Sequence, residues 1–286
     1  MNRLSARNSD GTAVKEKRSV LGSNPVMRRL EKVDEGAAEN CVTYSGITVK
    51  TTFFLLMTVA GIFLQVILSK QLATGSTFTF DYRGFQVELY TGEMIALAAA
   101  VLLGVVFQLL AFFVKGSTPV TGALYCVTQG YFISFLVFKV LHGMEYIGVL
   151  ALAITLLIIL VMAILFTTGA VRVTKKFRMV MLTLFISVIA ISLITLIASF
   201  IPFTRGIVSA IMGNFWVSVG ISVIYIVIAA LFLISDFAVI QSAVENQLPK
   251  KYEWQAAFGL AFTVLWIYLK VLQLLITIFG RGSRNS

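Results

Sequence analysis

The sequence predicts an all-α polytopic membrane protein with seven transmembrane helices. Of its 286 residues, 58% are apolar or aromatic and only 13% are charged, whereas soluble domains carry about 25% charged residues. The mean hydropathy is +0.93. Because so little charge cannot cover the surface of a soluble protein of this size, the composition excludes a soluble enzyme, a disordered chain and a secreted disulfide scaffold.

Seven apolar stretches predict the spans, since a bilayer core needs about 20 apolar residues per helix and helices satisfy their own backbone groups in lipid. They cover residues 51–68, 94–114, 120–138, 146–166, 180–201, 215–240 and 256–279. The chain therefore divides into a polar cytoplasmic tail (1–50), expected to be partly disordered, a transmembrane domain (51–280) and a short C-terminal tail (281–286). Glycines inside the spans are expected to allow close helix packing, and they include Gly61, Gly104, Gly220 and Gly259.

The connection after the first span contains a second pattern. Residues 77–90 alternate aromatic or aliphatic side chains with polar ones on both sides of Arg83. The alternation is compatible with a small β-hairpin across a turn, and aromatic residues at a membrane interface would explain it equally well.

Basic residues predict the orientation of the chain. The N-terminal tail and the connections on the same side of the predicted membrane carry 16 Lys and Arg residues, whereas the opposite side carries six. Excess Lys and Arg mark the cytoplasmic face, so the N-terminus is expected to be cytoplasmic and, with seven spans, the C-terminus extracytoplasmic. The tail also contains six acids and has a net charge of only +3, which argues against nucleic-acid binding. It has no apolar run of the kind that a secretory signal needs.

The sequence shows no motif for catalysis or for a cofactor. Cys41 and Cys126 are far apart and His142 is the only histidine, so neither a disulfide framework nor a zinc site is expected. Phosphate-binding loops, dinucleotide fingerprints and nucleophile elbows are absent. We therefore expect no enzyme, no cofactor and no firm metal site.

Three polar residues inside the spans are the candidates for function. Asp236 lies in the sixth span and Lys270 in the seventh, and an ionisable group there costs at least about 2.5–3.5 kcal/mol. The two helices can be antiparallel neighbours. In one interpretation, Asp236 and Lys270 form a static ion pair, or Asp236 is simply solvated at the interface. In the other, Asp236 responds to a proton or a cation, and its pairing opens or closes a path across the membrane. Gln129 in the third span could simply form an interhelical hydrogen bond.

Four blocks in order resemble the Bax inhibitor-1/YccA-like family of integral membrane proteins, and specifically its bacterial branch. They are SNPVMRRL at 23–30, RVTKKFR at 172–178, SDF at 235–237, and KYEWQAAFGL at 251–260 running into WIYL at 266–269. The resemblance implies a seven-helix bundle with a central last helix. It also implies a pH-sensitive calcium leak channel, in which acids on helices six and seven share a proton and act as gate and sensor.

The chain departs from that pattern at two positions. Asp236 matches the first family acid, but Lys270 stands where the family has Asp or Glu, and Gln129 where many members have Glu. Two carboxylates that share a proton titrate as a coupled pair, which an Asp–Lys pair cannot do. A lysine also repels a divalent cation, which needs several oxygen ligands. We therefore expect altered pH sensing and weaker calcium conduction, with Asp236 as a possible cation contact.

The leading interpretation is a cation leak channel gated around helices six and seven, in the bacterial inner (plasma) membrane. Its expected partners are the lipid bilayer and calcium or other cations, and not nucleic acid. The alternative is a non-conducting regulator that binds other membrane proteins, such as a membrane-anchored ATP-dependent protease, through the tail of about 50 residues.

Overall fold

The computed structural model describes residues 41–284, apart from 84, 115, 172, 202, 205, 207–209 and 211–212. The motif at 23–30 and most of the predicted tail lie outside the described residues. The elements are α3 (Tyr44–Leu72), β1 (Thr77–Tyr82), β2 (Phe85–Tyr90), α4 (Thr91–Phe113), α5 (Thr118–Phe135), the π-helical turn η1 (Leu136–Val140), α6 (Tyr146–Thr167), α7 (Lys175–Phe200), α9 (Phe215–Glu245) and α10 (Tyr252–Arg284).

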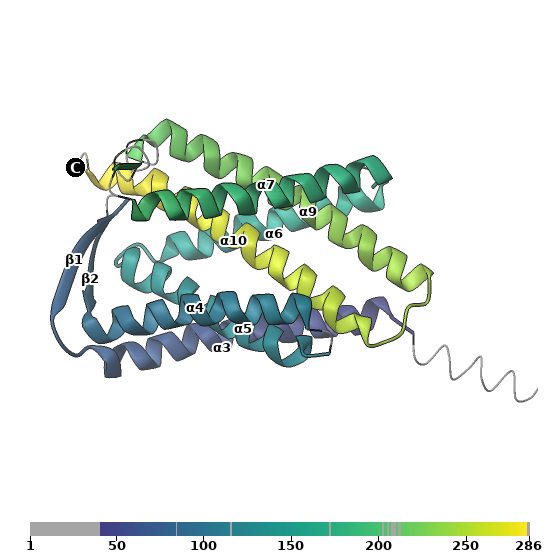
Figure 1. Ribbon diagram of the computed structural model, residues 1–286, viewed down its shortest axis with the longest axis horizontal. Coiled ribbons are helices and arrows are strands. Elements are labelled where there is room, and N and C mark those ends of the chain that lie inside the picture. The colour runs from purple at the N-terminus through teal and green to yellow at the C-terminus, as the bar shows by residue number, and fades with distance from the viewer. Residues whose placement is uncertain are drawn as a thin grey trace, which may run out of the picture.

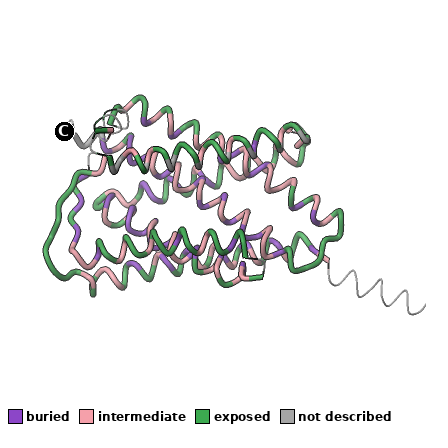
Figure 2. Tube along the Cα trace, in the orientation of Figure 1, coloured by how far each residue is buried: buried purple, intermediate pink, exposed green. Residues whose placement is uncertain are grey.

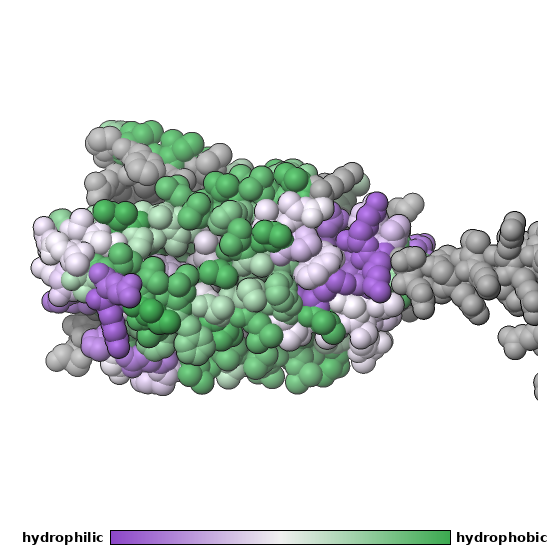
Figure 3. Space-filling model, turned by 90° about the horizontal axis from the view of Figure 1, so that it is seen from below, coloured by the Kyte–Doolittle hydropathy of each residue, from purple (hydrophilic) through white to green (hydrophobic). Residues whose placement is uncertain are grey.

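Six of the seven predicted spans are confirmed as helices that are long and apolar enough to cross a membrane. The fifth predicted span coincides with α7, where the described residues contain only a shorter apolar segment, Met179–Val188, that does not reach the length of a span. The described residues therefore support a helical, multi-pass membrane protein with six candidate spans. Figure 3 shows hydrophobic side chains over the middle of one face and hydrophilic ones gathered at its ends, as expected for a protein in a bilayer.

Several helices run beyond the predicted apolar stretches. Helix α3 begins at Tyr44, seven residues before the predicted start, and the Thr43 hydroxyl caps it by accepting a hydrogen bond from the Gly46 N–H at 3.0 Å. The Thr174 hydroxyl caps α7 in the same way, through the Phe177 N–H at 3.2 Å, and α7 begins at Lys175, before the predicted start at 180. Caps satisfy the free N–H groups of a helix start, so these helices extend past their hydrophobic segments.

Helix α10 occupies the centre of the bundle. It packs against α3, α5, α6 and α9, and in Figure 1 it crosses between a layer of α3, α4 and α5 and a layer of α6, α7 and α9. Buried residues follow it along much of its length (Figure 2). We call the end of the bundle where α3 and α10 begin the tail end, and the end where α3 and α10 finish, beside β1 and β2, the hairpin end.

Close contact between α3 and α5 depends on two glycines. A Cβ on Gly130 would overlap the carbonyl oxygen of Thr58, and one on Gly61 would overlap that of Val127. Small residues allow such close approach in membranes, so the expectation for Gly61 is confirmed.

The other three glycines named from the sequence differ among themselves. A Cβ on Gly104 would lie 3.1 Å from the hydroxyl of Thr128 on α5, which fits the expected close packing. The same expectation is wrong for Gly220 and Gly259, because a Cβ at either position would meet nothing within 4 Å.

The β-hairpin predicted for residues 77–90 is confirmed. Strands β1 and β2 pair antiparallel from Thr77–Tyr90 to Tyr82–Phe85, which leaves a two-residue connection that begins with Arg83. The side chains of β2 alternate, and Phe85, Val87 and Leu89 are buried against the bundle. The hairpin thereby closes the hairpin end beside the end of α10 (Figure 1).

Candidate functional site

Asp236 lies deeper in its helix than the sequence indicated. Helix α9 continues to Glu245, so Asp236 is about nine residues, or roughly 14 Å, from the helix end. Its Oδ2 atom is buried and has no hydrogen-bond partner among the described residues, and the same holds for Oγ of the neighbouring Ser235. The side chain of Thr263 on α10 is its hydrogen-bonding neighbour. The position is a buried acid with one hydroxyl neighbour on α10 and one carboxylate oxygen that has no hydrogen-bond partner among the described residues.

The register of α9 against α10 separates Asp236 from Lys270. The Lys270 ammonium lies over the ring of Tyr225, 4.8 Å from its centroid, whereas Asp236 lies beside Thr263. Asp236 and Tyr225 are about eleven residues apart on α9, or roughly 16 Å along its axis. The ion pairs found among the described residues do not join Asp236 to Lys270, so the structure does not bring these two predicted residues together.

Lys270 instead belongs to a basic group at the hairpin end. Its ammonium donates to Oε1 of Gln273, one turn further along α10, at 3.3 Å. The guanidinium of Arg83, from the hairpin turn, donates to the backbone oxygen of the same Gln273 at 3.3 Å and to the hydroxyl of Thr277. Arg83 is close enough to Lys270 for electrostatic repulsion.

Gln129 lies at a different interface. Its Nε2 atom is 3.6 Å from the place that a Cβ on Gly104 would take, so its amide lies between α5 and α4. That placement fits the interhelical role expected for an amide in a span. The three residues singled out from the sequence therefore occupy three separate environments.

An ion pair that the sequence did not reveal lies at the hairpin end. Glu93 is in the first turn of α4 and only 5% exposed, and its Oε1 lies 2.6 Å from the ammonium of Lys139 on the π-helical turn η1. The other carboxylate oxygen accepts from the Tyr90 N–H at 3.3 Å, in a capping box. An acid near the start of a helix can be recognised in the sequence as part of a capping box. The sequence does not show, however, that Lys139 lies close enough to form an ion pair with it.

A second such cluster lies at the tail end. Glu253, in the first turn of α10, is fully buried and forms an ion pair with Lys50 of α3. It also accepts from the backbone N–H and hydroxyl of Thr43, at 3.0 and 3.1 Å, and its carboxylate occupies the space beside Gly46 where a Cβ would stand. The Lys50 ammonium lies 5.3 Å from the centre of the Trp254 ring. The beginning of the described chain is thus tied to the beginning of the central helix.

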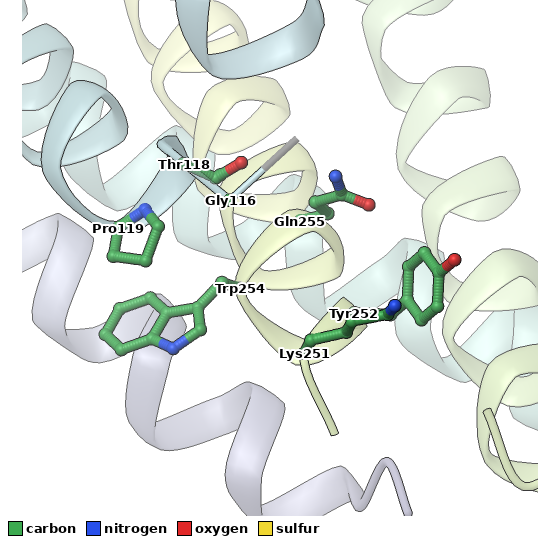
Figure 4. Close-up of a pocket in the computed structure, with 7 residues that line it drawn as sticks. All are labelled: Gly116, Thr118, Pro119, Lys251, Tyr252, Trp254 and Gln255. Carbon is green, nitrogen blue, oxygen red and sulfur yellow. The ribbon is translucent and has the colours of Figure 1, made fainter. Parts of the chain in front are cut away.

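A pocket of about 190 Å³ opens next to this cluster. In Figure 4 the Trp254 indole lies beside Pro119, and Gln255 and Lys251 lie on the other side of the pocket. The residues that line it come from the start of α5, the residues before it and the start of α10. Among the described residues no three His, Cys, Asp or Glu side chains gather as a metal site would require.

Comparison with known proteins identifies the family. Residues 24–280 match the family described as Bax inhibitor 1 like. A search of curated proteins finds no match. Because the family match begins within the motif at 23–30 and continues through α10, it covers nearly the whole chain and includes Asp236, Lys270 and Gln129. The chain belongs to the Bax inhibitor 1 like family of membrane proteins.

Proposed function

We propose that this protein is a cation leak pathway in the plasma membrane, with its N-terminus in the cytoplasm and its gate around α9 and α10. The buried Oδ2 atom of Asp236, which has no hydrogen-bond partner among the described residues, carries the proposal. A buried polar atom without a hydrogen bond costs free energy, and a charged one costs more. A proton or a cation bound at this carboxylate would remove that cost.

The surroundings of Asp236 suit such a role. Thr263 of α10 places a hydroxyl oxygen next to the carboxylate, and hydroxyl and carboxylate oxygens are the ligands that hard cations use. No described lysine or arginine forms an ion pair with Asp236. The acid is therefore free to respond to a proton or a permeating cation.

Reconstituted flux tests the proposal. Purified protein in liposomes should release monovalent cations and, more slowly, calcium, and Asp236→Asn should reduce both fluxes while leaving the helical circular dichroism unchanged. Lys270→Glu should raise calcium flux, because it replaces a positive charge that repels a divalent cation by an oxygen ligand. Wild-type flux no higher than that of empty liposomes would refute the proposal.

The second candidate function is a regulator that binds another membrane protein, such as a membrane-anchored ATP-dependent protease. The attachment of Thr43 and Lys50 to Glu253 favours it, because a partner that holds the tail would pull directly on the central helix. Deleting residues 1–40 should abolish co-purification with such a partner, whereas a leak pathway should keep its flux. A truncated protein that retains both the partner and the flux would remove the tail from either function.

A further inference from the structure

We propose that the hairpin end contains a binding site for a small inorganic anion, such as chloride, between the ammonium of Lys270 and the guanidinium of Arg83. The proposal goes beyond cation leakage and depends on a different group of residues. It starts from two cations, 187 positions apart in the sequence, that the fold brings to one residue of α10.

Gln273 accepts a hydrogen bond from each of the two cations. Its side-chain oxygen accepts from Lys270 and its backbone oxygen accepts from Arg83, each at 3.3 Å. The Arg83 guanidinium also reaches the hydroxyl of Thr277, one turn further along. All of these acceptors are neutral, so the hydrogen bonds orient the two cations without compensating their charge.

The ion pairs found among the described residues do not compensate the charge either. The ion pairs of the described residues use Lys50, Lys139 and His142 as their basic partners, and neither Lys270 nor Arg83 takes part. The Tyr225 ring under Lys270 offers only a cation–π interaction, which is weaker than an ion pair. Two like charges held together in a partly buried site cost free energy, and an anion between them would turn the repulsion into attraction.

The backbone also holds Arg83 in an unusual conformation. Its φ is +55°, a left-handed conformation that costs a non-glycine residue about 1–2 kcal/mol and for which two-residue hairpin turns favour Asn or Gly. The turn is pressed directly onto α10, because a Cβ on Gly280 would overlap the carbonyl oxygen of Arg83. Strain of this kind is typical of functional positions. Here its effect is to direct a guanidinium at the helix that carries Lys270.

The donors left over are sufficient for an anion. An ammonium has three N–H donors and a guanidinium has five. Lys270 uses one on Gln273, and the Nη1 atom of Arg83 serves Gln273 and Thr277. The remaining donors of both groups outnumber the few charge-assisted hydrogen bonds that one small anion needs.

The test uses the full chain in a neutral detergent that contains no phosphate, with gluconate exchanged for chloride at constant ionic strength. Chloride NMR line broadening should show binding to the wild type and a loss of binding in both Lys270→Gln and Arg83→Gln. At ten times Kd, chloride should also raise the Tm of the wild type by about 2–3 °C. Lys70→Gln is the matched control, because it removes an exposed lysine at the hairpin end of α3 and should keep both responses.

If Lys270 only stabilised the fold, replacing it would lower the Tm, whereas the anion site predicts a higher Tm when no binding anion is present. In gluconate, Lys270→Gln should have a higher Tm than the wild type, because the substitution removes the repulsion from Arg83. Chloride effects of equal size in the wild type and in Lys270→Gln would overturn the proposal, as would a wild type with no chloride response. A response that appears only when anionic phospholipid is added would also overturn it, since the ligand would then be a lipid headgroup. The measurements involve no transport, so a failed flux experiment leaves this site untouched.

Discussion

Replacing Lys50 by Met would remove the cation that stands beside the buried carboxylate of Glu253. The Glu253 side chain is 0% exposed and that of Lys50 is 16% exposed. Removing one partner of a buried ion pair typically costs about 3–5 kcal/mol, because the other charge is left uncompensated. Thr43 still donates two hydrogen bonds to Glu253, at 3.0 and 3.1 Å. We therefore expect the low end of the range, a loss of about 3 kcal/mol in the free energy of unfolding.

The loss can be measured by unfolding the purified protein in detergent with increasing denaturant, followed by circular dichroism. The control is Lys70→Met, which removes an exposed lysine from the same helix and should change stability by less than about 0.5 kcal/mol. The double variant Lys50→Met with Glu253→Leu removes both charges and should recover most of the loss. A cost below about 1 kcal/mol for Lys50→Met, the value of an exposed pair, would refute the reasoning. The reasoning would also be refuted if the double variant lost as much stability as the two single variants together.

Two further predictions concern packing and the second buried pair. Gly130→Ala should lower the free energy of unfolding by about 1–3 kcal/mol through overpacking, because the new Cβ would overlap a backbone carbonyl of α3. Gly220→Ala meets open space and should stabilise its helix by up to about 1 kcal/mol; equal effects in the two variants would contradict the close contact of α3 and α5. Lys139→Met leaves Glu93, which is 5% exposed, without its cation and should cost about 3 kcal/mol in thermal unfolding. Adding Glu93→Gln should restore most of that stability, and a single variant as stable as the wild type would show that the pair is solvated.

Most of the fold could be predicted from the sequence because lipid leaves few alternatives for an apolar segment. The positions of the helices follow from hydropathy alone, and the alternation around Arg83 was compatible with the hairpin, although it did not exclude interfacial aromatic residues. Helix ends were harder to predict. Polar residues such as Tyr44 and Lys50 lengthen α3 beyond its apolar stretch, and whether they do so depends on a cap and a buried ion pair rather than on hydropathy.

The candidate site was less predictable, for a physical reason. A sequence shows which residues are costly to place in a membrane, and on that ground Asp236 and Lys270 were singled out. It does not show the register between two helices, and this register places Lys270 beside Tyr225 rather than beside the acid. Its actual cationic neighbour, Arg83, is distant in the sequence and reaches it only because the hairpin folds onto the end of α10.

Charge is distributed unevenly along the pair formed by α9 and α10, and this has a consequence for transport. A cation moving from Asp236 towards the hairpin end would approach Lys270 and Arg83. At an effective dielectric constant of about 20, a single positive charge about 5 Å away raises its energy by about 3 kcal/mol, equivalent to roughly a hundredfold in rate. An anion bound between the two cations would cancel much of this barrier. If both proposals hold, wild-type cation flux should be up to about a hundredfold faster in chloride than in gluconate, whereas Lys270→Gln should conduct at the faster rate in both salts. Equal wild-type flux in the two salts, together with faster flux in Lys270→Gln, would mean that Lys270 obstructs the path but that no bound anion relieves it.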